Sequence, residues 1–376
     1  MTRWAGRRPT VRRLPSADAA GRRRRGFPVT GATPRPARPR PRHPGRLSLR
    51  RTAYAWRWRS FAGKLVRRAR RPLNPWIGSR QMKLMGNEHT TIAVVPDVEG
   101  IRGSLMEHGA VLLRGGSTDI GEFERFVRTV GGEPLEYTER STPRTSVTDA
   151  VYTSTEYPAD ASIPMHNEAS YSETWPGVLF FICATAAETG GATPIADSSA
   201  VYRLLPQRVL DHFAEGVVYT RSYRSDIGLS WQEAFQTEEP ADVEAYCKTH
   251  NQEFEWTPDG LRTRHHRPAH QDYRGRRVWF NQANLFHASS LSPDIYETLM
   301  EIYGEDGLPR NAYFGDGSPI PAEDLSAIKA AYDTASFAFP WEPGDVLIVD
   351  NMRCAHGRQP FTGKRRILVS MTAGLK

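Results

Sequence analysis

Charge is divided so unevenly along this 376-residue chain that only its later part can form an ordinary globular core. Residues 1–80 contain 24 lysines and arginines but a single acidic residue, Asp18, which gives this segment a net charge of +23. Residues 81–376 contain 26 basic and 41 acidic residues, a net charge of −15. The overall charge of +8 therefore reflects the first segment, and we expect no nucleic-acid binding by the folded body.

Residues 1–80 are rich in arginine, proline and glycine and show no hydrophobic periodicity. Such a composition buries too little apolar surface to offset the entropy lost on ordering, so we expect disorder. Three interpretations compete: a start codon assigned too early, with the true start near Met82 or Met85; a solvated tail without a specific role; or an anion-binding segment containing a basic amphipathic helix. We therefore expect a basic tail over residues 1–80 and a folded domain over residues 86–376.

The three cysteines, Cys183, Cys247 and Cys354, are widely spaced and form no CxxC pair. Neither a disulfide framework nor a zinc knuckle is indicated, and this cysteine usage favours a reducing, cytoplasmic location. No apolar run is long enough to span a bilayer, so we expect no membrane span. The sequence leaves open whether the chain forms a homo-oligomer.

Hydrophobic patterns in the folded domain predict β-strands at both ends with helices between them. The predicted strands cover residues 91–95, 110–116, 178–186, 276–281, 344–351 and 365–374. The predicted helices cover residues 98–109, 119–130, 198–216 and 323–336. Ser117 or Thr118 is the expected cap of the second helix. This order predicts an α+β fold in which one large antiparallel β core carries helical insertions.

Two candidate metal ligands lie in the stretch "IPMHNEASYSETWPG", residues 163–177. Side chains at positions i and i+2 of a strand point to the same face. If this stretch is extended, His166 and Glu168 converge on one point and Asn167 turns away. A His-x-Glu pair also arises often by chance, so the pair alone is a weak signal for a metal site, and two polar residues on an exposed strand are the more ordinary interpretation.

A second element near the C-terminus, "VDNMRCAHGRQPFTGKRRILVSM", supplies a third candidate ligand, His356. Two imidazoles and one carboxylate on one side of a metal leave three adjacent positions open, as in non-haem Fe(II) oxygenases. Arg366, ten residues after His356, could bind the far carboxylate of a chelating dicarboxylate through two hydrogen bonds. Thr193, just after the predicted Gly190-Gly191 turn, adds a hydroxyl donor.

Six motifs, in order from about residue 90 to the end, carry a resemblance to a known family. They are "VYTSTEYP", "MHNEASYSETWP", "GGATPIADSSAVYRLLP", "VWFNQANLFH", "LPRNAYFGDGSPI" and "DNMRCAHGRQPFTGKRRILVSM". With these motifs the sequence resembles the TauD/TfdA (taurine dioxygenase) family of Fe(II)/2-oxoglutarate-dependent oxygenases, and within it the SyrP-like branch. The resemblance implies a distorted double-stranded β-helix (jelly-roll) core of the clavaminate synthase/TauD type. It also implies that His166, Glu168 and His356 bind Fe(II), and that Arg366 and Thr193 bind 2-oxoglutarate.

The activity implied by the resemblance is a dioxygenase reaction with O2, in which 2-oxoglutarate yields succinate and CO2 and an unactivated C–H is hydroxylated. Related iron halogenases have a small residue in place of the carboxylate, so Glu168 implies hydroxylation or desaturation instead of halogenation. The SyrP-like likeness favours an amino-acid-type substrate in secondary metabolism such as antibiotic biosynthesis, free or on a peptidyl carrier protein. The candidate substrate residues are Tyr171, Trp175, Asn284, Arg310, Asn311 and Arg365. A sulfonate or aryloxy-acid dioxygenase and a catalytically inactive jelly-roll binding protein are the alternatives.

Overall fold

The computed structural model describes residues 82–135, 139, 145–148, 150–154 and 157–375. The expectations for residues 1–80 lie outside the described residues. All described residues belong to the unit Arg68–Lys376. Its first strand begins at Lys83, shortly before the expected domain start at residue 86.

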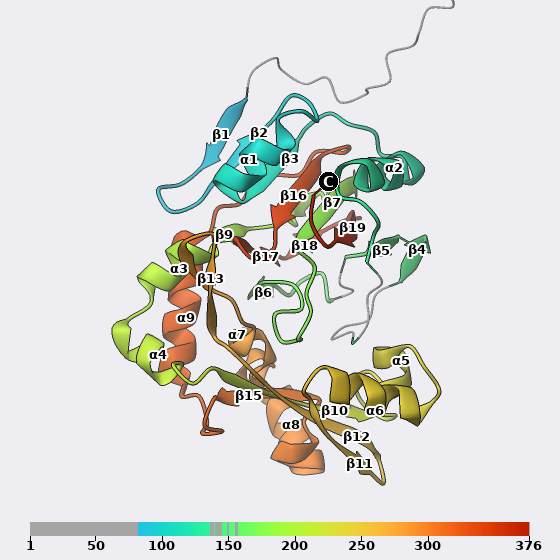
Figure 1. Ribbon diagram of the computed structural model, residues 1–376, viewed down its shortest axis with the longest axis vertical. Helices are drawn as coiled ribbons and strands as arrows, with labels where there is room; N and C mark the ends of the chain where they lie inside the picture. The colour runs from blue at the N-terminus through green and yellow to red at the C-terminus, as the bar shows by residue number, and fades with distance from the viewer. Residues whose placement is uncertain (1–81, 136–138, 140–144, 149, 155–156, 376) are drawn as a thin grey trace, which may run out of the picture. The chain divides into compact units, whose positions relative to one another are not determined.

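The largest sheet in the described part of the chain has eight strands and is antiparallel except for one pair, β2 and β3 (Figure 1). In spatial order its strands are β1 (Lys83–Gly86), β2 (Thr91–Val94), β3 (Ala110–Leu113), β16 (Val346–Asp350), β7 (Val178–Thr185), β19 (Arg366–Thr372), β5 (Val151–Thr153) and β4 (Ser146–Thr148). Five of the six strands predicted from sequence lie in this sheet, where the late strands β16 and β19 flank β7 and the N-terminal strand β1 forms one edge. Long-range pairing therefore joins β7 to β16 and β19.

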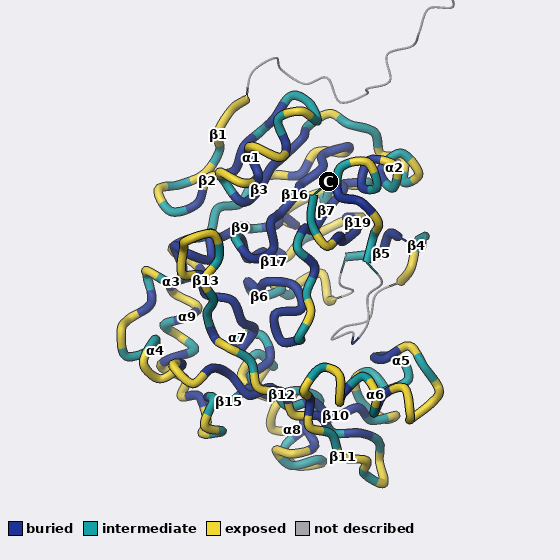
Figure 2. Tube along the Cα trace, viewed as in Figure 1, coloured by how far each residue is buried: buried dark blue, intermediate teal, exposed yellow. Residues whose placement is uncertain are grey.

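A smaller sheet packs against this large one and carries both candidate metal-binding histidines. Its strands are β6 (Ile163–His166), β17 (Cys354–Arg358) and β9 (Ile195–Asp197), in that order. Phe181 and Val349 of the large sheet share one hydrophobic cluster with Ile195 and Cys354 of the small sheet. Figure 2 shows these inner strands buried along most of their length. The burial of this shared apolar layer holds the two sheets together and so fixes β6 and β17, which carry the histidines, against the eight-stranded sheet.

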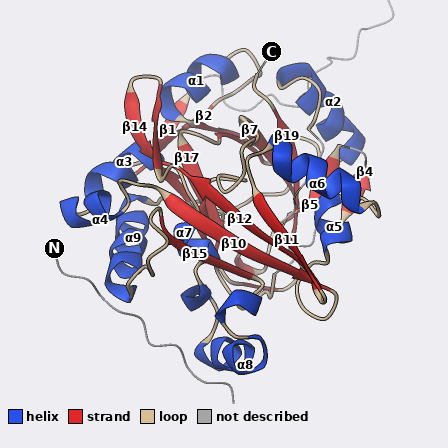
Figure 3. Cartoon of the chain, turned by 60° about the horizontal axis from the view of Figure 1, so that its bottom comes forward, coloured by secondary structure: helices blue, strands red, loops and turns tan. Residues whose placement is uncertain are grey.

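A separate four-stranded sheet lies on the far side of the histidine strands. Its order is β11 (Glu253–Thr257), β12 (Gly260–Arg267), β10 (Val217–Arg224) and β15 (Arg310–Phe314). Figure 3 shows these strands side by side, with the short helix α7 (Ala283–Phe286) next to β15. Two two-stranded sheets complete the strands: the hairpin of β13 (His270–Tyr273) with β14 (Arg276–Trp279), and the long-range pair of β8 (Thr189–Gly190) with β18 (Phe361–Thr362). The predicted strand 276–281 thus belongs to a hairpin and not to the large sheet.

Helices fill the connections between the strands, so the α+β prediction is confirmed. They are α1 (Ile101–His108), α2 (Ile120–Val130), α3 (Ser198–Leu204), α4 (Gln207–His212), α5 (Trp231–Phe235), α6 (Pro240–Thr249), α8 (Pro293–Tyr303) and α9 (Ala322–Ala335). Over the described residues, none of the helices combines the length and the apolar character needed to cross a membrane.

Two local predictions were wrong. The single helix expected over residues 198–216 is two helices, because Pro206 removes a backbone N–H and forces Leu205 to an extended ψ of 135°. The cap of α2 is Asp119, whose Oδ1 accepts a hydrogen bond from the Glu122 N–H at 2.8 Å. Ser117 instead accepts a bond from the Asp119 N–H at 3.1 Å, outside the helix. A carboxylate at this position also interacts favourably with the positive end of the helix dipole.

Candidate active site

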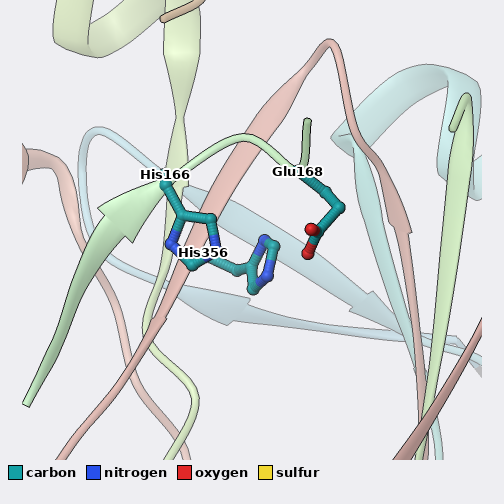
Figure 4. Close-up of side chains that lie close together, drawn as sticks. All are labelled: His166, Glu168 and His356. Carbon is teal, nitrogen blue, oxygen red and sulfur yellow. The ribbon is translucent and has the colours of Figure 1, made fainter. Parts of the chain in front are cut away.

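The candidate ligands His166, Glu168 and His356 lie together at the interface of the two packed sheets. His166 ends β6, and its Cα partner across the ladder is His356 of β17. The two rings have centroids 4.4 Å apart, and the Glu168 carboxylate faces them (Figure 4). One ligand atom from each of the three residues lies within 4.8 Å of the other two, and all three residues are buried.

This donor set fits a single divalent ion. Ligand atoms at about 2.1 Å from a shared ion are themselves about 3 Å or more apart, so small side-chain rotations would close the present spacing. Two imidazole nitrogens and one carboxylate oxygen match the facial triad of non-haem Fe(II) sites. In the part of the chain that the structure describes, no other group of three such residues meets the same condition.

The local route to this convergence differs from the expected one. The strand ends at His166, and Asn167 begins a turn, so Glu168 does not reach the site through strand alternation. The turn is closed by hydrogen bonds from the Ser170 N–H to the Asn167 carbonyl and from the Ser172 N–H to the Ala169 carbonyl. Ala169 has a positive φ of 53°, which orients the turn after Glu168. Asn167 is not solvent-facing but fully buried.

Asn351 joins this turn to the end of β16. Its Oδ1 accepts a hydrogen bond from the Glu168 N–H at 2.7 Å, and its Nδ2 donates to the carbonyl oxygens of Glu168 and Pro176. The Asn167 Nδ2 donates in return to the Asn351 carbonyl at 2.6 Å. Asp350, by contrast, caps the following turn by accepting from the Met352 and Arg353 N–H groups. Of the two neighbours, only Asn351 bonds directly to the turn that carries Glu168.

The tautomer of His166 is set by a local bond. Its Nδ1 lies 2.8 Å from the Pro164 carbonyl oxygen, which can only accept a hydrogen bond. Nδ1 therefore carries the proton, and the lone pair of Nε2 is left for a metal.

A small cationic cavity of about 40 Å³ adjoins both histidines. Among its lining residues are Thr193, Arg358 and Arg365, together with His166 and His356. Arg358 donates to the carbonyl oxygens of Tyr157, Pro158 and Ala161, and Arg365 donates through Nε to the Gly191 carbonyl at 2.9 Å. No carboxylate among the described residues forms an ion pair with either guanidinium. The cavity therefore carries a positive charge that the described side chains do not neutralise, which suits the binding of an anion.

The structure places the two adjacent arginines differently from the sequence expectation. Arg366 is exposed and does not line the cavity, whereas Arg365 does. Burial, and then the nearby Arg358 charge, lower the pKa of Arg365 to about 10, so it remains protonated at neutral pH. Gly191, with a φ of +69°, makes room for the Arg365 side chain, since a Cβ there would lie 3.0 Å from Arg365 Cδ. Arg365, and not the predicted Arg366, is therefore the arginine of this pair that lines the cavity beside the candidate ligands.

Thr193 lies where the sequence placed it, just after the Gly190-Gly191 turn, and it is buried. The Trp341 Nε1–H donates to Thr193 Oγ1 at 3.1 Å. Because this bond uses an acceptor site of the hydroxyl, the Thr193 proton can be donated to an anion in the cavity.

Two of the candidate substrate residues line a cavity, and two others, Asn284 and Arg310, do not line it. Tyr171 and Trp175 line a cavity of about 240 Å³ beside the Glu168 turn. Asn284 donates through Nδ2 to the Met165 carbonyl at 3.1 Å, one residue before His166. Arg310 lies over the Phe286 ring, at 5.5 Å from its centroid.

Asn311 is not available as a substrate residue. Its Oδ1 accepts from the N–H groups of Ala288 and Ala312, and its Nδ2 donates to the Tyr313 hydroxyl. Asn311 therefore ties β15 to the segment after α7.

Sequence reasoning missed two residues at this site. Arg358 lies two positions after His356 on the same strand, so strand parity could have found it. Glu139 is buried and accepts bonds from Ser172, Tyr246 and Gln252, while the Tyr171 hydroxyl donates to its carbonyl at 2.8 Å. These partners of Glu139 lie more than 30 residues away along the chain, so no local sequence pattern predicts the contacts.

Comparison with known proteins agrees with this geometry. The model of the family "Taurine catabolism dioxygenase TauD, TfdA family" matches residues 69–372. The dapdiamide synthesis protein DdaC of Enterobacter agglomerans is 42% identical over 272 residues, which cover 71% of this chain and 83% of DdaC. A clavaminate synthase-like protein of Arabidopsis thaliana is 33% identical over 286 residues, covering 71% of this chain and 82% of that protein.

A solved structure with similarity to this chain is PvcB of Pseudomonas aeruginosa, an Fe, α-ketoglutarate-dependent oxygenase from an isonitrile synthetic pathway. It is 16% identical, with a TM-score of 0.45, and the match covers 81% of this chain and 99% of PvcB. The family match and the identity to DdaC establish the relationship by themselves. The chain belongs to the TauD, TfdA family and is an oxidoreductase, an oxygenase that depends on Fe(II) and 2-oxoglutarate.

Proposed function

We propose that the protein hydroxylates an unactivated C–H bond of an amino-acid-type substrate in secondary metabolism and converts 2-oxoglutarate to succinate and CO2. The observation that carries this proposal is the convergence of two buried imidazoles and one carboxylate beside a small cationic cavity. Similarity to a dapdiamide synthesis protein supports a biosynthetic role. Within this proposal, His166, Glu168 and His356 are the three ligands of the metal.

Within this proposal, several residues of the cavity bind 2-oxoglutarate. Bound Fe(II) supplies the activation of O2 that oxidises the co-substrate and the C–H bond. We assign the far carboxylate of 2-oxoglutarate to Arg365 and Thr193, with Arg358 adding positive charge. A cavity of about 40 Å³ admits a carboxylate and little more, which favours a slender dicarboxylate over a bulky substrate. Arg365 is partly buried and hydrogen-bonded to the Gly191 carbonyl, so it is already oriented before the co-substrate binds.

The proposal also includes the type of β core and the cellular compartment. The packed eight-stranded and three-stranded sheets support a distorted double-stranded β-helix as the core. The three cysteines are free and buried, which supports a reducing compartment such as the cytoplasm.

Anaerobic titration of the full chain with Fe(II) and 2-oxoglutarate tests the site directly. We expect a visible metal-to-ligand charge-transfer band in the wild type and none in His356→Ala. A wild-type protein that binds Fe(II) but never develops the band would refute the co-substrate assignment.

Turnover is then measured as substrate-dependent succinate release against free and carrier-bound amino acids, with mass analysis of the products. We expect the active compound to gain the mass of one oxygen atom. The charge-transfer band without stimulated succinate release from any amino-acid-type compound would contradict the substrate assignment and favour a binding protein.

A further inference from the structure

Arg310 presents a positive charge that the described protein residues do not neutralise. It begins β15, and its Cα partner on the neighbouring strand β10 is Arg221. Like charges at directly opposite positions of an antiparallel pair repel each other. Arg221 is compensated by the Glu139 carboxylate at 3.7 Å and by the Tyr223 ring at 4.5 Å. Within the described ranges no carboxylate forms an ion pair with Arg310, and its guanidinium lies over the Phe286 ring, 5.5 Å from the ring centroid.

The Phe286 contact connects Arg310 to the metal-ligand segment. Phe286 belongs to α7, which lies between β15 and β6 (Figure 1). The Phe286 ring packs on Tyr171 with centroids 4.8 Å apart, and Tyr171 follows Glu168 by three residues. Asn284 of the same helix is bonded to the residue before His166. One short helix therefore contacts both the Arg310 guanidinium and the segment that carries two of the three candidate ligands.

Arg310 is also near a residue that bonds to the lining of the cavity assigned to 2-oxoglutarate. Tyr157 is near enough to Arg310 to act on its pKa, and the Tyr157 carbonyl accepts a hydrogen bond from Arg358 Nη1 at 3.0 Å. Arg358 lines the cationic cavity beside His166 and His356, whereas Arg310 does not line it. Arg310 is therefore linked to the Glu168 turn through the Phe286 ring and lies near Tyr157, which bonds to Arg358, but it is outside the co-substrate cavity.

The energetic state of Arg310 favours an anionic ligand. The residue is partly buried, and burial together with the Arg221 charge lowers its pKa. A guanidinium that has lost hydration and faces a like charge gains more from an incoming carboxylate than a solvated one does. The planar fork of N–H donors can hold that carboxylate through two parallel bonds.

We propose that Arg310 binds a carboxylate of the prime substrate, so that this enzyme oxidises carboxylate-bearing compounds. This inference rests on the proposed function, because it names a group of the substrate that reacts at the same metal site. Arg310 would then hold the substrate while Arg365 holds 2-oxoglutarate, and the two anions would occupy separate arginine sites. A substrate delivered as a thioester would have to carry a second, free carboxylate.

The test uses the full chain and the variants Arg310→Gln and Arg310→Lys. The control variant is Arg264→Gln, an exposed arginine on β12 of the same sheet. Succinate release is measured with free amino acids, with their carboxamides and with pantetheine thioesters. We expect stimulation only by compounds with a free carboxylate. For the best of them we expect Arg310→Gln to raise KM at least ~30-fold, with the KM for 2-oxoglutarate unchanged.

Arg310→Lys keeps the charge but not the paired donors, so we expect a smaller rise in KM, and Arg264→Gln should behave as wild type. Equal activity with the carboxamide, preference for a neutral compound, or an unchanged KM in Arg310→Gln would each overturn the inference.

A separate measurement distinguishes failure of this inference from failure of the proposed function. The Fe(II)/2-oxoglutarate charge-transfer band should form in all the variants, because Arg310 does not line the co-substrate cavity. Calorimetric binding of the same carboxylate and its amide to wild type and Arg310→Gln reports on Arg310 without turnover. Loss of the band in the wild type with Arg310-dependent carboxylate binding intact refutes the proposed function alone. A normal band with equal binding of carboxylate and amide refutes the inference alone.

Discussion

Asn351 and Glu168, which are 183 residues apart, form two hydrogen bonds with each other at the centre of the site. The Glu168 N–H donates to Asn351 Oδ1 at 2.7 Å, and Asn351 Nδ2 donates to the Glu168 carbonyl at 2.9 Å. The bonds hold the backbone of Glu168, whose carboxylate faces the histidines (Figure 4). Closure of the turn after β6 therefore depends on the end of β16.

Asn351→Ala should lower the affinity for Fe(II) by about 10- to 100-fold, because residues that orient a metal ligand contribute on this scale. Fe(II) binding is measured by anaerobic competition with a chelator. The control is Asn87→Ala, which also removes three side-chain hydrogen bonds to the backbone, far from the site. We expect both variants to lose stability and only Asn351→Ala to lose iron affinity. Equal iron affinities in the two variants would show that Asn351 has a purely structural role.

The adjacent arginines Arg365 and Arg366 provide a matched pair for 2-oxoglutarate binding. Removing one partner of a buried charged pair costs about 2–5 kcal/mol, so Arg365→Gln should raise the KM for 2-oxoglutarate at least ~30-fold. Arg366→Gln should behave as wild type, because Arg366 is exposed and does not line the cavity. Initial rates at varied 2-oxoglutarate decide between them. The reverse order of effects would return the role to Arg366.

Thr193→Val removes the hydroxyl proton that can reach an anion while keeping the shape of the side chain. A hydrogen bond to a charged group contributes about 1.5–3 kcal/mol, so affinity for 2-oxoglutarate should fall roughly tenfold or more. Thr189→Val is the control, since that exposed hydroxyl bonds to Thr362, its partner in the β8–β18 pair. Titration of the charge-transfer band measures both variants. A normal affinity in Thr193→Val would remove this residue from the co-substrate site.

Asp345 should make stability depend on pH. Burial raises the pKa of its carboxyl from 3.8 to about 6, although Arg114 and the Glu342 N–H oppose the shift. The folded state therefore disfavours the ionised form, and this cost is absent below the unfolded pKa and complete above about pH 6. Asp345→Asn cannot titrate, so the unfolding free energy of wild type minus that of Asp345→Asn should fall between pH 4 and 7. The total fall should be no more than about 3 kcal/mol.

Denaturant unfolding of the two proteins across this pH range measures that difference. A difference that stays constant with pH would mean that Asp345 is ionised at its ordinary pKa in the folded protein.

The sequence alone predicted those strands and helices whose hydrophobic pattern lies within a few neighbouring residues. The apolar run from Val178 predicts β7 because its period and length suit a buried strand, and the strands before and after the insertions follow from the same pattern. Family-like motifs place His166, Glu168 and His356 in order along the chain. In these cases the information lies within a few neighbouring residues.

Only the tertiary structure decided how those residues meet. Glu168 reaches the histidines through a turn held by Asn351, and a prediction from strand alternation had no means of including a partner 183 residues away. That Arg365 and not Arg366 lines the cavity depends on the contact of Arg365 with Gly191, at the start of the last strand. Neighbouring arginines have the same local chemistry. Which of them faces the cavity is fixed by long-range packing, because that contact involves a segment distant in the sequence.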